Sequence, residues 1–243
     1  MRALLGVVIA AACALLAVPG PARAARTLFT TDFRLEQCDF SDVGRNAYFS
    51  VQPGDQLCLT GEEGKETVEV KITALDDTRE IAFETERGVQ LDLTTRVVEE
   101  REWKDDELVE VSRNFFARCE QTGEVYYFGE EVDIYEGGQI VSHEGAWLAG
   151  ENGAQPGLIM PATYLLGSRY FQEIAPDVAL DRAEHTASGL EITVPAGTFT
   201  DCVEVTETSP LEPGHKSVKV YCPGVGLTVD DAVELAECEV QGE

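Results

Sequence analysis

Basic residues are scarce in this chain. Its 243 residues include 18 Lys and Arg against 45 Asp and Glu, a formal net charge of −27 at pH 7. Such an excess of negative charge repels phosphate backbones and anionic lipid headgroups. The composition therefore argues against nucleic acid and membrane surfaces as partners and favours cations. Acids spread over exposed strand positions would also serve solubility alone.

The chain also lacks an uninterrupted apolar run of the roughly 20 residues that span a bilayer. Residues 3–18 are apolar, but Pro-Gly-Pro at 19–21 ends this stretch, and Ala-Arg-Ala at 22–24 fits a cleavage site. We interpret residues 1–24 as a secretory signal peptide. The mature protein is then exported, to the periplasm or the extracellular medium, and keeps no transmembrane segment. Lipid attachment at Cys13 is the alternative to this cleavage.

Cysteine pairs at metal-ligand spacing are missing. No C-x-x-C occurs, and the three histidines lie far from the cysteines in sequence, so structural zinc is not indicated. Cys13 leaves with the signal peptide, and the even number that remains predicts up to three disulfides in an oxidising compartment. The candidates are Cys38, Cys58, Cys119, Cys202, Cys222 and Cys238.

Two registers are open for the hairpin that contains Cys202 and Cys222. If these cysteines face each other a disulfide fits, but Val205 then lies opposite Lys219. A register slipped by one residue pairs valines with valines and Glu204 with Lys219, which suits a sheet with one apolar and one wet face. The pattern favours the slipped register and argues against this disulfide, unless a bulge restores it.

Long helical patterns are absent, and polar and apolar residues alternate instead. Residues 66–73 alternate at a period of two, as in a strand with one buried face. Similar segments follow between Gly and Pro turns, with short helical turns expected at most near 177–185 or 231–238. We predict an all-β fold with antiparallel sheets, built as an open or half barrel or a sandwich. Residues 25–243 form a single domain, which could include a small lobe at 25–77.

Catalytic signatures are weak. No G-x-S-x-G elbow is present, and neighbours on a strand, such as Ser142 and His143, point to opposite faces. Asp181 with His185 is a second grouping of suitable residue types. A secreted hydrolase is thus a minor alternative. We assign no catalytic residue and favour a protein that is not an enzyme.

Metal and nucleotide loops are also missing. No segment matches the D-x-[DN]-x-[DN]-G calcium loop, and no glycine loop is followed by the lysine that binds phosphates. The nearest approach to a calcium site is the acidic group Glu130, Glu131, Asp133 and Glu136. No cofactor is predicted, with calcium as the candidate exception.

Aromatic residues gather between positions 126 and 170 with a few polar groups, a mixture found in small-molecule pockets. A plain aromatic core would have the same composition. The ligand-binding candidates are Tyr126, Tyr127, Glu130, His143, Glu144, Trp147, Met160 and Tyr170.

The chain contains a set of motifs in a recognisable order: Tyr-Tyr-Phe-Gly-Glu at 126–130, Glu-Gly-Ala-Trp at 144–147, Gly-Glu-Asn-Gly-Ala-Gln-Pro-Gly at 150–157 with Met-Pro-Ala at 160–162, Val-Pro-Ala-Gly-Thr-Phe at 194–199, and Leu-Glu-Pro-Gly at 211–214 followed by Tyr-Cys-Pro-Gly-Val-Gly at 221–226. Over residues 46–235 the chain resembles a family of exported bacterial proteins of unassigned function, which implies no catalytic residues. The Pro-Ala-Gly-Thr-Phe turn also looks like that of periplasmic open or half barrels, some of which hold lipid-like ligands. That second likeness is an analogy of fold alone.

Together these patterns predict an exported binding or structural module of the cell envelope, whose partner is a small molecule or an envelope component. If it binds, we expect an apolar or amphipathic small molecule held in a curved sheet by Tyr127, Trp147 and Tyr170. The alternative is an acidic surface protein stabilised by calcium or another cation.

Overall fold

The structure is a computed structural model that describes residues 28–238. In this part of the chain one short 3-10 helix, η1 (Leu35–Gln37), precedes sixteen strands. The first eight are β1 (Phe40–Ser41), β2 (Gln56–Glu63), β3 (Glu66–Glu84), β4 (Gln90–Lys104), β5 (Glu107–Cys119), β6 (Val125–Glu136), β7 (Gln139–Ser142) and β8 (Trp147–Leu148). The others are β9 (Gln155–Met160), β10 (Arg169–Phe171), β11 (Glu173–Ile174), β12 (Arg182–Val194), β13 (Gly197–Thr208), β14 (Ser217–Cys222), β15 (Gly226–Asp230) and β16 (Val233–Ala236).

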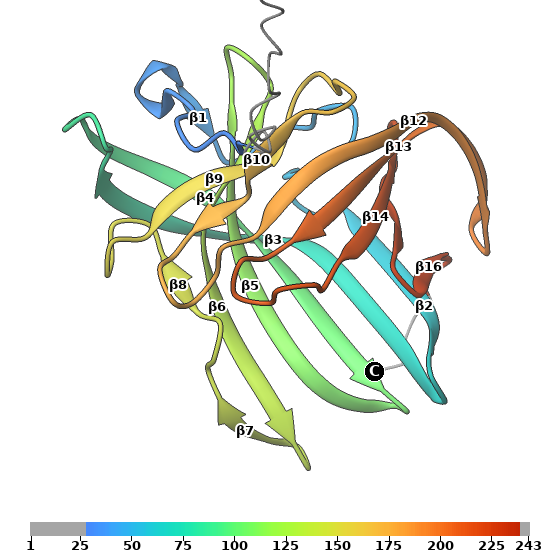
Figure 1. Ribbon diagram of the computed structural model, residues 1–243. Coiled ribbons are helices and arrows are strands. Elements are labelled where there is room, and N and C mark those ends of the chain that lie inside the picture. Colours follow the sequence, from blue (N-terminus) through green and yellow to red (C-terminus); the bar gives the residue numbers. More distant parts are fainter. Residues whose placement is uncertain (1–27, 239–243) are drawn as a thin grey trace, which may run out of the picture.

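The strands form a single antiparallel sheet that curls into a nearly closed barrel (Figure 1). Its order is β10-β12-β13-β14-β15-β16-β2-β3-β4-β5-β6-β9-β11, while β1 pairs with β5, and β7 and β8 pair with β6. The predicted all-β, antiparallel fold is therefore confirmed. Neither of the segments in which short helical turns were allowed contains a helix, since β12 begins at Arg182 and β16 covers Val233–Ala236.

The two edge strands of the nearly closed barrel are β10 and β11, and the place where they meet is called the joint. These two strands follow each other in sequence, separated by Gln172, yet β10 pairs with β12 and β11 pairs with β9. Gly157 on β9 allows the backbone of Gln172 to pack against β9, because a Cβ atom at position 157 would lie 2.4 Å from the carbonyl carbon and oxygen of Gln172. At the other junction β16 pairs with β2, so the last strand of the chain meets the first strand of the barrel.

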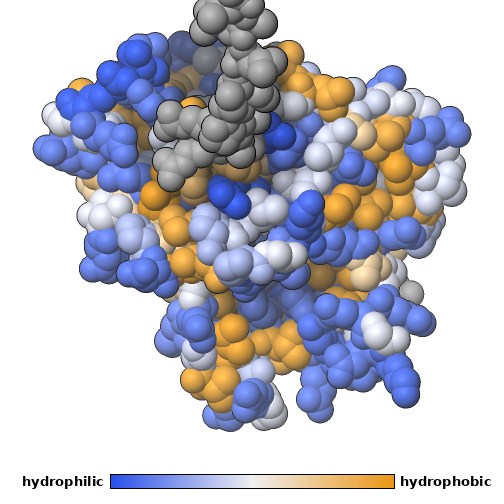
Figure 2. Space-filling model, in the orientation of Figure 1, coloured by the Kyte–Doolittle hydropathy of each residue, from blue (hydrophilic) through white to orange (hydrophobic). Residues whose placement is uncertain are grey.

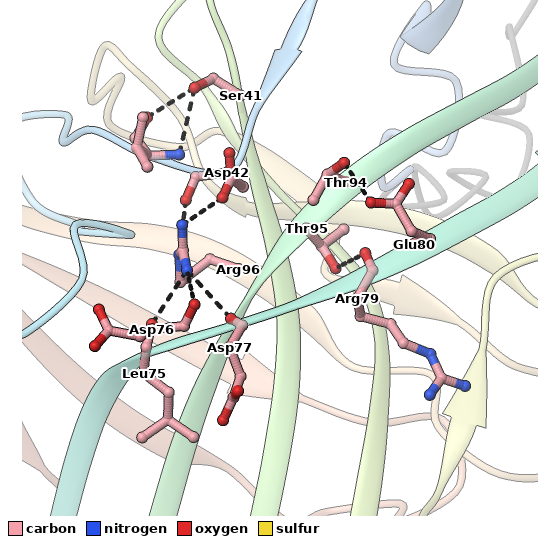
Figure 3. Close-up of polar contacts among 11 residues, drawn as sticks. Ser41, Asp42, Leu75, Asp76, Asp77, Arg79, Glu80, Thr94, Thr95 and Arg96 are labelled. Carbon is pink, nitrogen blue, oxygen red and sulfur yellow. Dashed lines mark hydrogen bonds and ion pairs between the residues drawn. The ribbon is translucent and has the colours of Figure 1, made fainter.

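A buried arginine fixes the bend in the long strand β3. The pairing of β3 with β4 is interrupted between Ala74 and Thr78, and Arg96 of β4 is only 4% exposed beside this bulge. Its Nη1 donates to the carbonyl oxygens of residues 75, 76 and 77, at 3.2, 2.8 and 3.2 Å (Figure 3). Its Nε and Nη2 bind the carbonyl oxygen and the carboxylate of Asp42. Arg96 thus satisfies the backbone of the bend and ties it to the N-terminal segment.

The N-terminal segment covers one face of β6. The ring of Phe40 lies 5.9 Å from that of Tyr126 and 5.3 Å from that of Phe128, both in edge-to-face geometry. A disulfide between Cys38 and Cys119 joins the same segment to β5. β2 and the first half of β3, which also fall within residues 25–77, belong to the barrel itself.

All six cysteines that follow the expected signal peptide are paired. Besides Cys38–Cys119, disulfides join Cys58 to Cys238 and Cys202 to Cys222. Three disulfides are typical of proteins that fold in an oxidising, extracytoplasmic compartment. The expected signal peptide, residues 1–24, lies outside the described residues. Within residues 28–238, no helix has the length and apolar character needed to cross a bilayer.

The predicted register of the β13–β14 hairpin is wrong. The structure pairs Val205 with Lys219 and Glu204 with Val220, so Cys202 and Cys222 can form their disulfide without a bulge in this pairing. The physical reason is that Lys219 does not face the outer solvent. It lines a cavity inside the barrel, while the cysteines pack with Val220 in a small cluster on the other face.

Candidate functional site

The interior of the barrel holds a cavity of about 590 Å³, the size range of small-molecule sites. All strands from β2 to β15 except β7, β10 and β12 contribute residues to its lining. Its aliphatic lining is Leu57, Ile72, Ala74, Val98, Ile159 and Leu227. The loop at residues 45–50 also contributes to the lining, and Arg45 there keeps 57% of its side chain exposed and pairs with Asp55. On the outside, hydrophilic residues cover most of the face in Figure 2, with hydrophobic areas between them.

One wall of the cavity is aromatic. Tyr127 of β6 stands at its centre, with its ring 4.8 Å from that of Phe116 and 5.1 Å from that of Trp147. Phe49, from the loop at residues 45–50, packs edge-on against Phe116, with the two ring centroids 5.1 Å apart. The Tyr127 hydroxyl donates to Asn114 Oδ1 at 2.5 Å, which fixes the ring in place.

Three carboxyl groups on neighbouring strands face the same cavity: Glu100 of β4, Glu110 of β5 and Glu130 of β6. Burial raises the pKa of Glu100 to about 7; Lys219 opposes this rise, while Asp230 and Glu110 add to it. Burial, followed by repulsion from Glu110 and Glu100, raises the pKa of Glu130 to about 7. The pKa of Glu110 is raised as well, first by burial. Within residues 28–238 none of the three forms an ion pair with a basic side chain.

Lys219 is the basic group inside this part of the barrel. Its Nζ lies 3.2 Å from Glu207 Oε2 and 3.4 Å from Asp230 Oδ2. Burial opposes the charged form, but the two carboxylates outweigh it and raise the pKa of Lys219 well above its ordinary value. The amine therefore stays an ammonium group near neutral pH and cannot act as a nucleophile.

The joint of the barrel supplies a further polar group. Gln172 is 3% exposed; its Nε2 donates to Glu207 Oε1 at 2.7 Å, and its Oε1 has no hydrogen-bond partner among the described residues. Beside it, Glu173 Oε1 accepts the backbone N–H of Asp181 at 2.7 Å, and burial raises the pKa of this carboxyl well above its ordinary value. An acceptor left unpaired in such a place has a free energy cost of about 1–3 kcal/mol.

The indole of Trp147 also has an unused polar atom. Trp147 is 7% exposed and lines the cavity, and its Nε1 has no acceptor in the described part of the chain. β8 places it opposite Glu130 of β6. The cavity therefore combines an aromatic wall, three carboxyl groups without ion pairs, one unused acceptor and one unused donor.

The predicted ligand-binding residues divide into three groups. Tyr127, Glu130 and Trp147 line the cavity. Tyr126 and Met160 are buried but lie outside its lining. The third group lies away from the cavity. Tyr170 is hydrogen-bonded to His185, and His143 and Glu144 are at the surface, where His143 Nδ1 is 3.0 Å from Asp133 Oδ1.

His185 has a structural arrangement of hydrogen bonds. Its Nδ1 lies 3.0 Å from the carbonyl oxygen of Leu165, which can only accept, so Nε2 accepts the hydroxyl proton of Tyr170 at 3.0 Å. Burial lowers the pKa of His185, and its ring stacks on Tyr164. No serine or acid completes a catalytic triad around it in the described hydrogen bonds.

The four acids considered for calcium point in different directions. Glu130 faces the cavity, Glu131 lies 3.5 Å from Arg79 on the outside, and Asp133 pairs with Arg113. Glu136 is exposed at the end of β6. Across residues 28–238, no three His, Cys, Asp or Glu side chains are placed to hold one metal ion.

Sequence reasoning missed most of the polar lining, namely Glu100, Glu110, Asn114, Gln172, Glu173, Glu207 and Lys219. A signal existed on β5, where Glu110, Ser112 and Asn114 alternate with Val111, Arg113 and Phe115. Alternation assigns the polar set to one face, but the usual assumption places that face in solvent. Here it encloses the cavity.

Comparisons with protein-family models, curated proteins and solved structures found no match. The resemblance to exported bacterial proteins of unassigned function therefore stays a prediction.

Proposed function

We propose that this protein binds a small amphipathic molecule inside its barrel, in an exported, oxidising compartment. The observation that carries the proposal is the cavity of about 590 Å³, whose aromatic wall faces polar groups without protein partners. Binding pockets are mostly apolar with a few placed polar groups, whereas a plain core would be filled by its own side chains. The three disulfides support the compartment.

The binding step needs no covalent chemistry. The apolar part of a ligand would lie against Phe116, Tyr127 and Trp147, where it removes apolar surface from water. Its polar part would reach Gln172 Oε1 or the Trp147 Nε1–H and supply the hydrogen bonds that no described protein group makes to these atoms.

A fluorescent apolar amine of very low basicity, N-phenylnaphthylamine, tests this proposal. We expect saturable binding to the disulfide-bonded protein with a stoichiometry of about one and a rise in dye fluorescence. Ala179→Trp adds a bulky ring to the cavity lining and should weaken binding by about tenfold or more.

Ala82→Trp is the matched control, because Ala82 lies on the exposed face of β3. It should leave dye binding unchanged. Both variants are first checked for an unchanged circular dichroism spectrum. Equal dye affinity in the two variants would exclude the barrel cavity as the binding site.

A further inference from the structure

The charges inside the cavity are unbalanced. Glu100, Glu110 and Glu130 line it together, and no basic side chain among the described residues pairs with them. Lys219, a basic group of the same cavity lining, is already held by Glu207 and Asp230. Three carboxyl groups therefore line one cavity without an ion-pair partner of their own, because Lys219 and Arg45, which also line it, are held by other carboxylates.

A second observation is independent of the acids. Gln172 is buried, lines the same cavity, and its Nε2 is committed to Glu207, which leaves Oε1 without a donor. A carbonyl oxygen can only accept hydrogen bonds. The unmet need at the joint is thus for an N–H or O–H group supplied from the cavity.

The aromatic wall suits the same kind of group. The faces of tyrosine and tryptophan rings attract cations electrostatically, and Tyr127 and Trp147 stand beside Glu130 in this wall. A single metal ion would leave most of the 590 Å³ unfilled. An organic molecule would fill it.

We propose that the ligand of this cavity is an organic cation, namely a protonated amine on an apolar body. The inference rests on the proposed binding function and adds the charge of the ligand to it. The ammonium group has three N–H donors, and the acceptors open to them are the carboxylates of Glu100, Glu110 and Glu130 and Gln172 Oε1, while the apolar body packs on Tyr127 and Trp147.

Binding of a cation is then coupled to proton release. Since the pKa values of Glu100 and Glu130 are about 7, both groups are partly protonated near neutral pH and lose protons when a cation binds. The charged and titratable groups that face them from the surrounding strands are Glu102, Glu110, Glu173, Glu207, Lys219, Tyr127, Tyr221 and Asp230. Of these, Lys219 opposes the cation and the acids favour it.

Three probes with one apolar body separate charge from shape: phenylbutylamine, phenylbutanol and phenylbutyrate. By isothermal titration calorimetry at about pH 8, we expect the amine to bind about tenfold or more tightly than the alcohol, with the carboxylate weakest. Lowering the pH to about 5.5 protonates Glu100 and Glu130 and should weaken the amine by about tenfold, with little change for the alcohol.

Glu130→Gln and its neighbour Glu131→Gln form a matched pair, because Glu130 faces the cavity and Glu131 faces Arg79 outside. Glu130→Gln should weaken the amine by about tenfold and spare the alcohol. Glu131→Gln should change neither. Each variant is checked by its melting temperature.

The outcomes distinguish the two proposals. If the alcohol binds as tightly as the amine, and Ala179→Trp weakens both, the cavity binds ligands but the inferred positive charge is wrong. If none of the three probes binds and N-phenylnaphthylamine fails as well, the binding function itself is overturned. Equal loss in Glu130→Gln and Glu131→Gln would assign the effect to overall charge and contradict a site at Glu130.

Discussion

Glu100 and Glu130 are carboxyl groups whose neutral form is favoured by the fold up to about pH 7. Burial raises the pKa of each to about 7, above the ordinary value of 4.5. Between these two values the folded state holds protons that the unfolded state has lost. Stability therefore falls as the pH rises through this range, and the loss is complete above the folded pKa.

We expect Glu100→Gln to raise the melting temperature at about pH 8, because it removes a carboxylate that burial disfavours. At about pH 4 the native carboxyl is already protonated, and the variant should melt within about a degree of the parent protein. Thermal unfolding followed by circular dichroism over this pH range measures both. Glu131→Gln, on the exposed face of β6, is the control. An identical shift at both pH values would show that the gain does not come from the ionised form of Glu100.

Individual residues were the hardest level to predict from sequence. Tyr127, Glu130 and Trp147 were expected in a site and do line the cavity, since their neighbourhood combines aromatic and polar residues. Glu173 and Lys219 were not expected. Periodicity reports which residues share a face of a strand, but it does not report whether that face encloses a wet cavity or meets the solvent.

At the scale of elements, the β13–β14 hairpin shows how this ambiguity spreads. The slipped register was preferred because it kept Lys219 away from Val205, yet the two residues are paired. A shift of one residue moves every side chain to the other face. The assumption that charged side chains face the solvent therefore predicts the wrong register, and with it the wrong conclusion that Cys202 and Cys222 do not form a disulfide.

The pairing of β9 with β11, next to the joint, gives a prediction at the scale of elements. Gly157→Ala should lower the free energy of unfolding by about 2 kcal/mol or more, because the added Cβ would lie 2.4 Å from the backbone of Gln172 and no side-chain rotation relieves this contact. Gly138→Ala, in a hairpin with φ of +75° and open space around it, tests backbone strain alone and should lose about 1 kcal/mol. Urea unfolding measures both. A smaller loss for Gly157→Ala than for Gly138→Ala would contradict the close approach.

For the whole molecule, the all-β class, the antiparallel pairing and the use of six cysteines followed from composition, alternation and turn residues. Closure did not. The barrel depends on contacts between segments far apart in the chain, such as β16 with β2 and β9 with β11. Local patterns do not encode which distant strands become neighbours.

The disulfides act on the unfolded chain according to the length that they enclose. Cys58–Cys238 spans 180 residues and Cys202–Cys222 spans 20. Replacing both cysteines by alanine should lower the free energy of unfolding by about 5 kcal/mol for the long loop and about 3 kcal/mol for the short one. Urea unfolding of the two double variants measures the difference. A larger loss from the short loop would mean that packing around Cys202 outweighs chain entropy.

Two strand pairings that bring distant parts of the chain together, β16 with β2 and β9 with β11, are held by different kinds of interaction. At β16–β2, hydrogen bonds are reinforced by Cys58–Cys238, which turns the chain between these residues into a covalent macrocycle. At β9–β11, two residue pairs hold the edge beside Gln172. If the β16–β2 pairing opens, the disulfide still tethers its two strands, whereas none of the three disulfides crosses the β9–β11 pairing. The β9–β11 edge is therefore the easier of the two to open.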